Sequence, residues 1–264
     1  MAADQVAGFK GSARPQDLPP VAEERQLTLV DHLEELRRVV LISMVAWLVA
    51  TGVAFAFNHQ IIGILERPLH LALQHTHSPF GQNVVVTSPI EGLSIPFKVA
   101  AAGGIVLSLP ITVWQIWTFV SPGLRRTERH LAFPFIFGTL FFFALGGVFA
   151  YFILPVGLTF LATFLGSNAV YLPDLNAYLT FLALVVLIFG VTFEMPVVLC
   201  TLGAVGIVSS RRLRSWRKAA YFIIVAVALI VTPGADPFTP SFLSVALIVL
   251  YEGSILVVAH AFRR

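Results

Sequence analysis

Long stretches of apolar residues are the feature that most constrains this chain. A helix needs about 20 such residues to cross the hydrocarbon core of a bilayer. The candidate stretches are Val39–Phe57, Val99–Val120, Leu131–Ile153, Tyr178–Leu202, Ala219–Thr232 and Ser241–Ala259. Only 12% of the 264 residues are charged, about half the share that is usual in soluble domains. The sequence therefore predicts an all-α, polytopic membrane protein with six transmembrane helices.

The fifth stretch, Ala219–Thr232, is the shortest, with 14 residues. A segment of that length also suits a re-entrant or buried core helix, and this alternative stays open at the level of sequence. The fourth and sixth stretches are long enough, although each contains one acidic residue, Glu194 and Glu252 respectively.

Basic residues indicate how the helices are oriented. Of the 17 lysines and arginines, 15 lie in four segments: before the first stretch, between the second and third, between the fourth and fifth, and after the sixth. Six crossings place all four segments on one side, and the positive-inside rule assigns that side to the cytoplasm. We therefore expect both termini in the cytoplasm. The basic excess behind the net charge of +3 therefore serves to orient the protein in the membrane. We expect no nucleic-acid partner.

The rest of the chain is simple in organisation. Residues 1–26 mix Gly, Pro, Gln, Ala and charges without a period, which predicts a disordered cytoplasmic tail. Residues 27–264 are expected to form one six-helix transmembrane domain. The external segment Asn58–Glu91 is expected to contain short helices. The single cysteine, Cys200, excludes an intrachain disulfide, and we expect no metal or cofactor because no Cys/His ligand spacing is present.

Glu194 is the most unusual residue of the apolar stretches. It lies near mid-bilayer, where a charged side chain costs about 2.5–3.5 kcal/mol. It should therefore face protein or a wet cavity, or be protonated. The alternative is a structural acid that bonds to a neighbouring helix. Gln115, within the run WQIW, is a second polar residue in an apolar stretch.

Four prolines interrupt the apolar stretches or their ends: Pro110, Pro134, Pro155 and Pro196. Proline removes a backbone donor and weakens a helix locally. We therefore expect a bent bundle with a concave wall, and a weak point next to Glu194.

Two acidic motifs lie among arginines on the predicted cytoplasmic side. In DHLEELRR, Glu34 and Glu35 precede Arg37 and Arg38, and Glu128 lies in the run RRTER. Locally, each acid is most simply paired with a nearby arginine. Spacing alone does not join the two motifs into one site.

Four motifs occur in order between Leu29 and Val258: DHLEELRR, PFKVAAAGGIVLSLPITVWQIWTFVSPGLRRTERH, FEMP and TPGADPF. Together they resemble the TatC family, the integral-membrane receptor of the twin-arginine protein translocase. The family's topology has six helices and cytoplasmic termini, as the charges predict. The resemblance implies binding and not catalysis, since family members present carboxylates to two consecutive arginines of a cargo signal peptide.

The resemblance also implies roles for particular residues. Glu35 and Glu128 match the two arginine-binding carboxylates, and Glu34 takes second place beside Glu35. The positions that line or shape the site are Arg37, Phe119, Pro122 and Leu124. Glu194 matches an intramembrane glutamate that contacts a partner helix. The positions of the external cap are Pro68, Lys98 and Asp236, although Gly92 and Leu93 replace a bulkier pair.

The implied partners are twin-arginine signal peptides of folded cargo, single-helix subunits of the TatA and TatB type, further copies of this chain and membrane lipid. The implied location is the inner membrane, and the implied energy source is the proton-motive force. The alternative function is a secondary transporter or channel, which also uses broken helices and buried acids. That alternative predicts an inverted repeat, and the two halves of the sequence show none.

Overall fold

The computed structural model describes residues 29–74, 84–121, 131–164, 172–233 and 236–261. Within these ranges the chain forms helices and one isolated β-bridge. The helices are α1 (Leu29–Ala56), α2 (Asn58–Leu65), α3 (Arg67–Gln74), α4 (Glu91–Val120), α5 (Ala132–Phe164), α6 (Leu175–Thr192), α7 (Met195–Ala204), α8 (Ser210–Ser215), α9 (Arg217–Val231) and α10 (Phe238–Ala261). The predicted all-α class is confirmed for the described ranges, and the predicted tail, residues 1–26, lies outside them.

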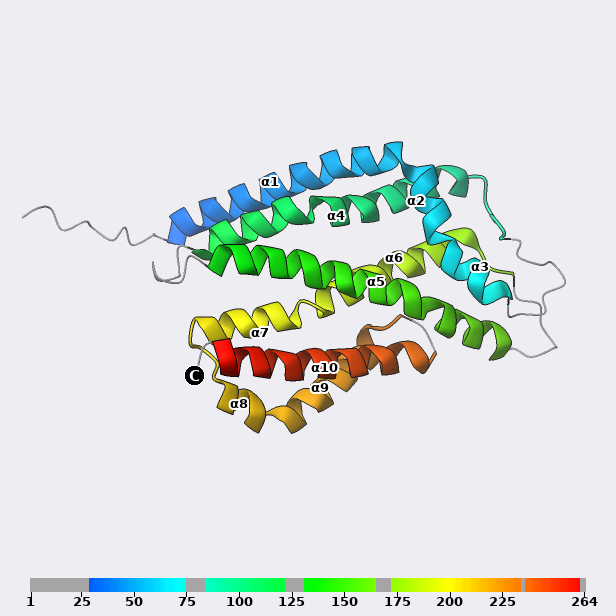
Figure 1. Cartoon of the computed structure of the whole chain (residues 1–264). Coiled ribbons are helices and arrows are strands. Elements are labelled where there is room, and N and C mark those ends of the chain that lie inside the picture. Colours follow the sequence, from blue (N-terminus) through cyan, green and yellow to red (C-terminus); the bar gives the residue numbers. More distant parts are fainter. Residues whose placement is uncertain (1–28, 75–83, 122–130, 165–171, 234–235, 262–264) are drawn as a thin grey trace, which may run out of the picture.

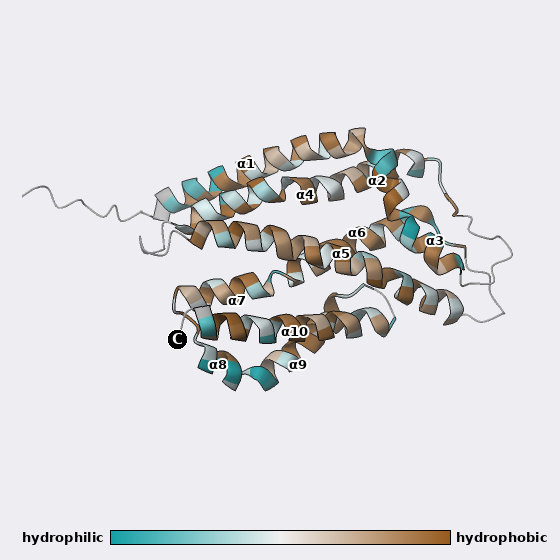
Figure 2. Ribbon diagram, in the orientation of Figure 1, coloured by the Kyte–Doolittle hydropathy of each residue, from teal (hydrophilic) through white to brown (hydrophobic). Residues whose placement is uncertain are grey.

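Five segments are long and apolar enough to cross a membrane: His32–Ala56, Glu91–Val120, Ala132–Phe164, Leu175–Ala204 and Phe238–His260. Apolar residues predominate along the long helices, and hydrophilic residues gather at the start of α1 and around α8 (Figure 2). The fifth predicted span, Ala219–Thr232, corresponds to α9. Its 15 residues reach about 22 Å, which is less than the ~30 Å of a typical hydrocarbon core.

The fourth predicted span is broken where the sequence indicated. α6 ends at Thr192 and α7 begins at Met195, so Glu194 lies in the turn between them. Pro196 occupies the first turn of α7, where its missing N–H costs no helical hydrogen bond. Pro110 and Pro155, by contrast, lie inside helices that continue past them. The expectation that these two prolines interrupt their spans is wrong, and the concave wall stays a prediction.

α1 and α4 run antiparallel in close contact (Figure 1). The reason is a small residue at the seam: a Cβ atom added to Gly104 would lie 2.9 Å from the Cα atom of Thr51. In addition, the Trp47 Nε1–H donates to the Ala101 carbonyl at 3.0 Å. Close backbone approach and interhelical hydrogen bonds are the main attractions available to helices in lipid.

α5 and α6 pack by the same means. A Cβ atom added to Gly146 would lie 2.5 Å from the Phe189 carbonyl oxygen, and one added to Gly190 would meet the Phe143 ring. Around this contact lie the fully buried side chains of Leu182, Val185 and Phe189. The core therefore centres on α6.

Within Asn58–Glu91, the segment predicted to be external and to contain short helical or capping structure, the chain forms the two short helices α2 and α3. The hydroxyl of Tyr151, on α5, donates to the Ile64 carbonyl at 2.9 Å, and that of Tyr178, on α6, donates to the Leu65 carbonyl at 2.7 Å. These bonds fix the α2–α3 turn to the long helices, while Leu69 is fully buried beneath it.

We predict that Gly146→Ala destabilises the protein, because the new methyl group meets backbone atoms of α6 that cannot rotate away. Overpacking of this kind costs about 1–3 kcal/mol. Thermal unfolding in detergent should show the loss. Gly52→Ala is the matched control, since a Cβ atom there meets nothing within 4 Å. Equal melting temperatures for the two variants would contradict the packing argument.

Candidate functional site

Glu35 lies at the start of α1, beside the end of α4. The imidazole ring of His32 stacks on the Phe119 ring of α4, with 4.4 Å between centroids and 19° between planes. One turn further along α1, Glu35 Oε2 lies 4.0 Å from His32 Nδ1. The Glu35 side chain is 31% exposed, whereas the side chains of Glu34 and Arg37 are exposed. Of Glu34, Glu35 and Arg37, Glu35 is the most buried, and its carboxyl group still reaches solvent.

The structure brings together only part of the predicted arginine site. Glu35 and Phe119 share the end of the α1–α4 pair. Glu128, Pro122 and Leu124 lie outside the described residues. In the sequence, Glu128 belongs to the connection between Val120, where α4 ends, and Ala132, where α5 begins. Gln115 lies one turn before Phe119 and is half-buried in α4.

Glu194 is half-buried in the α6–α7 turn. Thr139, on the facing α5, is close enough to hydrogen-bond to its carboxyl group. The Oε1 atom of Glu194 is buried and, among the described residues, has no hydrogen-bond partner. The carboxyl group therefore lies within reach of a neighbouring helix, as a structural acid would, and keeps one acceptor oxygen unmatched, as the partner interpretation needs.

The three predicted cap residues occupy different places. Pro68 is buried in α3, and Lys98 Nζ donates to Asn176 Oδ1 at 2.8 Å, near the start of α6. Asp236 is buried, and its Oδ1 accepts from the Thr239 N–H at 2.7 Å. Asp236 thus caps the start of α10.

Sequence reasoning missed two polar clusters. Glu252, on α10, forms an ion pair with Arg217 and accepts a hydrogen bond from the Tyr221 hydroxyl at 2.5 Å, both on α9. The signal was present in the sequence, as an acid in one apolar stretch and an arginine at the start of the previous one. The second cluster surrounds Asp174, whose Oδ1 atom accepts from the Ala177 N–H at 2.6 Å and so caps α6. The backbone of Asp174 also forms the isolated parallel β-bridge with Val85.

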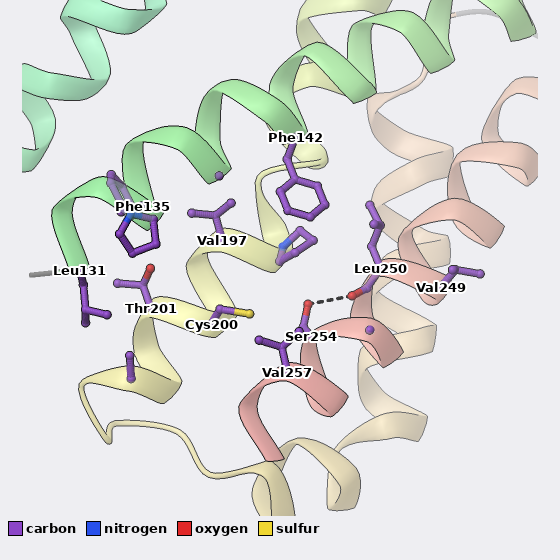
Figure 3. Close-up of a pocket in the computed structure, with 15 residues that line it drawn as sticks. Leu131, Phe135, Phe142, Val197, Cys200, Thr201, Val249, Leu250, Ser254 and Val257 are labelled. Carbon is purple, nitrogen blue, oxygen red and sulfur yellow. Dashed lines mark hydrogen bonds between the residues drawn. The ribbon is translucent and has the colours of Figure 1, made fainter. Parts of the chain in front are cut away.

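An apolar pocket of about 460 Å³ lies between α5, α7 and α10 (Figure 3). Phe135 and Phe142 face it from α5, and Cys200 and Ser254 face it from α7 and α10 (Figure 3). The Ser254 hydroxyl donates to the Leu250 carbonyl at 2.7 Å, so its proton is held by a backbone carbonyl and not by a general base. No group of three potential metal ligands occurs among the described residues. This pocket offers an apolar surface and no reactive constellation.

Comparison with known proteins decides the family. The model of the Sec-independent protein translocase protein TatC matches residues 31–245. The chain belongs to the TatC family. TatC of Frankia casuarinae is 35% identical over 241 residues, which are 89% of this chain and 66% of the relative. TatC of Deinococcus radiodurans is 36% identical over 246 residues, 93% of this chain and 90% of the relative.

The fold agrees with the family. A crystal structure of the twin arginine translocase receptor TatC in DDM is similar with a TM-score of 0.71 and 33% identity. The match covers 86% of this chain and 98% of that chain. TatC proteins are components of a protein translocase and not enzymes. The resemblance found from DHLEELRR and the other motifs is therefore confirmed, and the alternative of a secondary transporter or channel loses its support.

We predict that Asp236→Ala lowers the stability of this TatC protein by about 1 kcal/mol, the usual cost of losing a helix N-cap. Thermal unfolding in detergent measures the effect. Asp236→Asn is the matched control, because asparagine caps a helix as well as aspartate does. An equal loss in both variants would show that the charge, and not the cap, is what the fold requires.

Proposed function

We propose that this chain is the receptor subunit of the twin-arginine translocase, which binds the signal peptides of folded proteins through Glu35 and Glu128. The observation that carries the proposal is the position of Glu35, half-buried beside the His32–Phe119 stack at the end of the α1–α4 pair. A carboxylate held against a packed surface is partly desolvated, and a charge-assisted hydrogen bond is strong in such a place.

The choice of arginine follows from the chemistry of the carboxylate. A guanidinium group offers a planar fork of donors that matches both carboxylate oxygens, and a lysine ammonium group does not. Successive side chains of an extended peptide point in opposite directions. Two adjacent arginines therefore need acids from two different segments, and Glu35 in α1 and Glu128 in the α4–α5 connection supply them.

The proposal includes six crossings with both termini in the cytoplasm. In support, the start of α1 and the end of α10 lie at the same end of the molecule, on the left of Figure 1. α9 completes the count as a short sixth span. A span shorter than the hydrocarbon core thins the adjacent bilayer at modest cost, which would ease the passage of cargo driven by the proton-motive force.

The proposed partners follow from the exposed apolar surface of the long helices. Single-helix subunits of the TatA and TatB type, further copies of this chain and lipid would cover the exposed apolar side chains of the long helices. Glu194 offers its unmatched Oε1 atom to a polar group of a partner helix, since a buried acceptor without a partner costs about 1–3 kcal/mol. The proposed location is the inner membrane.

We predict that cysteine labelling reports six crossings. In a Cys200→Ser background, Pro237→Cys places one thiol just before α10, and an impermeant reagent added outside whole cells should label it. The matched control is Arg214→Cys in α8, which should react only after the membrane is opened. If α9 does not cross the membrane, Pro237→Cys will be protected from the outside.

We predict that the purified chain retains a twin-arginine peptide and releases its twin-lysine counterpart. Glu35→Gln should weaken retention about 10- to 100-fold, because a hydrogen bond to a charged group contributes roughly 1.5–3 kcal/mol. Glu34→Gln, one position away and exposed, should have a smaller effect. Fluorescence anisotropy of a labelled peptide measures both.

The double variant Glu35→Gln with Glu128→Gln tests whether these two acids together account for arginine selectivity. Arginine selectivity that survives in the double variant would contradict the assignment of the two acids. Equal binding of both peptides to the unaltered chain would contradict the receptor function itself.

A further inference from the structure

A strongly basic surface follows α7. Residues 207–219 include five lysines and arginines and no acid. They form α8 and the start of α9, where hydrophilic residues gather in Figure 2. The five basic residues are called the basic patch, and all of them are exposed: Arg211, Arg212, Arg214, Arg217 and Lys218.

The patch is built on a fixed platform. The hydroxyl of Ser209 caps α8, because it accepts from the Arg212 N–H at 3.3 Å. Leu213 is buried, and its carbonyl accepts from the Tyr251 hydroxyl of α10 at 2.8 Å. These contacts hold one side of α8 to α10, so the arginines on its other sides face away from the protein.

The acid that meets the patch, Glu252 of α10, is already satisfied. It forms an ion pair with Arg217 through Oε2, and its Oε1 atom accepts from the Tyr221 hydroxyl at 2.5 Å. Among the described residues, the other four basic residues of the patch form no ion pair. The patch therefore keeps cationic groups that an anion from outside the chain can reach.

The patch adjoins apolar surface. Trp216 is 63% exposed among the basic residues, and Phe222, one turn after Lys218, is 75% exposed. The four residue steps from Lys218 to Phe222 cover about 6 Å along α9. Tryptophan is enriched at the boundary between lipid and water. Cationic groups around an indole are thus followed by apolar side chains, the order in which a phospholipid presents its headgroup and its acyl chains.

The short length of α9 adds to this match. A span of about 22 Å draws the nearby headgroups inward, since the hydrocarbon core is ~30 Å thick. Headgroups drawn inward at the start of α9 lie beside the patch. Opposite charge on the headgroup would stabilise it in this position.

The start of α1 has the opposite charge. Residues 29–38 contain three acids and two arginines, and α1 and α8 lie on opposite edges of the molecule in Figure 1. A twin-arginine peptide is attracted to the start of α1 and repelled by the patch. The patch is therefore suited to a different, anionic partner.

We propose that the basic patch binds the headgroup phosphate of an anionic phospholipid, with Trp216 at the interface and the acyl chains along Phe222 and Ile223 of α9. A zwitterionic headgroup carries a cation that the patch repels, whereas an anionic headgroup does not. Free phosphate would leave Trp216 and Phe222 unused. The inference rests on the proposed crossing of α9 and not on recognition of the signal peptide.

Fluorescence quenching in lipid nanodiscs tests the proposal on the full chain. In a Cys200→Ser background, Ala219→Cys places a dye beside the patch, and Leu33→Cys places one at an exposed position in the acidic start of α1. The probes are phosphatidylglycerol and phosphatidylcholine with a nitroxide quencher near the top of one acyl chain, each added to the same mixture of both lipids. Phosphatidylglycerol should quench the dye at position 219 several-fold more than phosphatidylcholine does, and the dye at position 33 about equally.

Two charge variants separate the patch from basic residues in general. Arg211→Gln with Arg212→Gln should lower the preference for phosphatidylglycerol several-fold, because each basic residue near an anionic surface contributes about fivefold to affinity. Salt at about 1 M should act in the same direction, since it shortens the screening length to about 3 Å. Arg37→Gln with Arg38→Gln removes the same charge from exposed positions of α1 and should leave the preference at position 219 unchanged.

The outcomes are distinct. Equal quenching by the two lipids at position 219, or a preference that survives Arg211→Gln with Arg212→Gln, would overturn the inference. Displacement of phosphatidylglycerol by millimolar inorganic phosphate or by an acidic peptide would assign the patch to a soluble anion and overturn it too. Quenching by neither lipid would place α8 away from the bilayer with the same consequence, and labelling of Pro237→Cys then reports whether α9 crosses.

The receptor function is measured separately on the same nanodiscs. Arg211→Gln with Arg212→Gln should leave binding of the twin-arginine peptide unchanged. Loss of lipid preference with intact peptide binding supports the patch as an independent site. Loss of peptide binding in this variant as well would show that the patch serves the peptide, and would overturn the inference.

Discussion

Close approach between helix backbones is the interaction on which the rest of this structure depends. In lipid, apolar side chains gain little by leaving one apolar environment for another, so helices associate through packing and hydrogen bonds. Gly104 lets α4 contact Thr51 of α1, and Gly146 lets α5 contact the backbone of Phe189 in α6. The antiparallel pairs built in this way position everything else. Glu35 meets the end of α4 only because the α1–α4 pair keeps its register over its whole length.

The two acids inside apolar stretches, Glu194 and Glu252, differ in whether their surroundings supply hydrogen-bond partners. Glu252 has Arg217 and Tyr221 as partners, and together they attach the short α9 to α10. Glu194 has Thr139 nearby, but its Oε1 atom is buried without a partner among the described residues. A satisfied acid is part of the fold. An acid that keeps an unmatched oxygen is suited to accept a group from outside the chain.

Sequence predicts the features of this fold that depend on local chemistry. Apolar length predicted the long helices, and Pro196 predicted the break beside Glu194, because both act within a few residues. Pro110 and Pro155 were harder, since a helix continues past a proline when its neighbours satisfy the freed carbonyl groups. The His32–Phe119 stack and the Asp174–Val85 bridge join residues 87 and 89 positions apart. No periodicity within one segment reports such contacts.

In the candidate site, too, sequence predicts a residue but not the contacts that surround it. Motif resemblance found Glu35 but gave no reason for its place in α1, and the structure supplies one. An acid at this point lies where a solvated surface changes, within one helical turn, into an apolar seam.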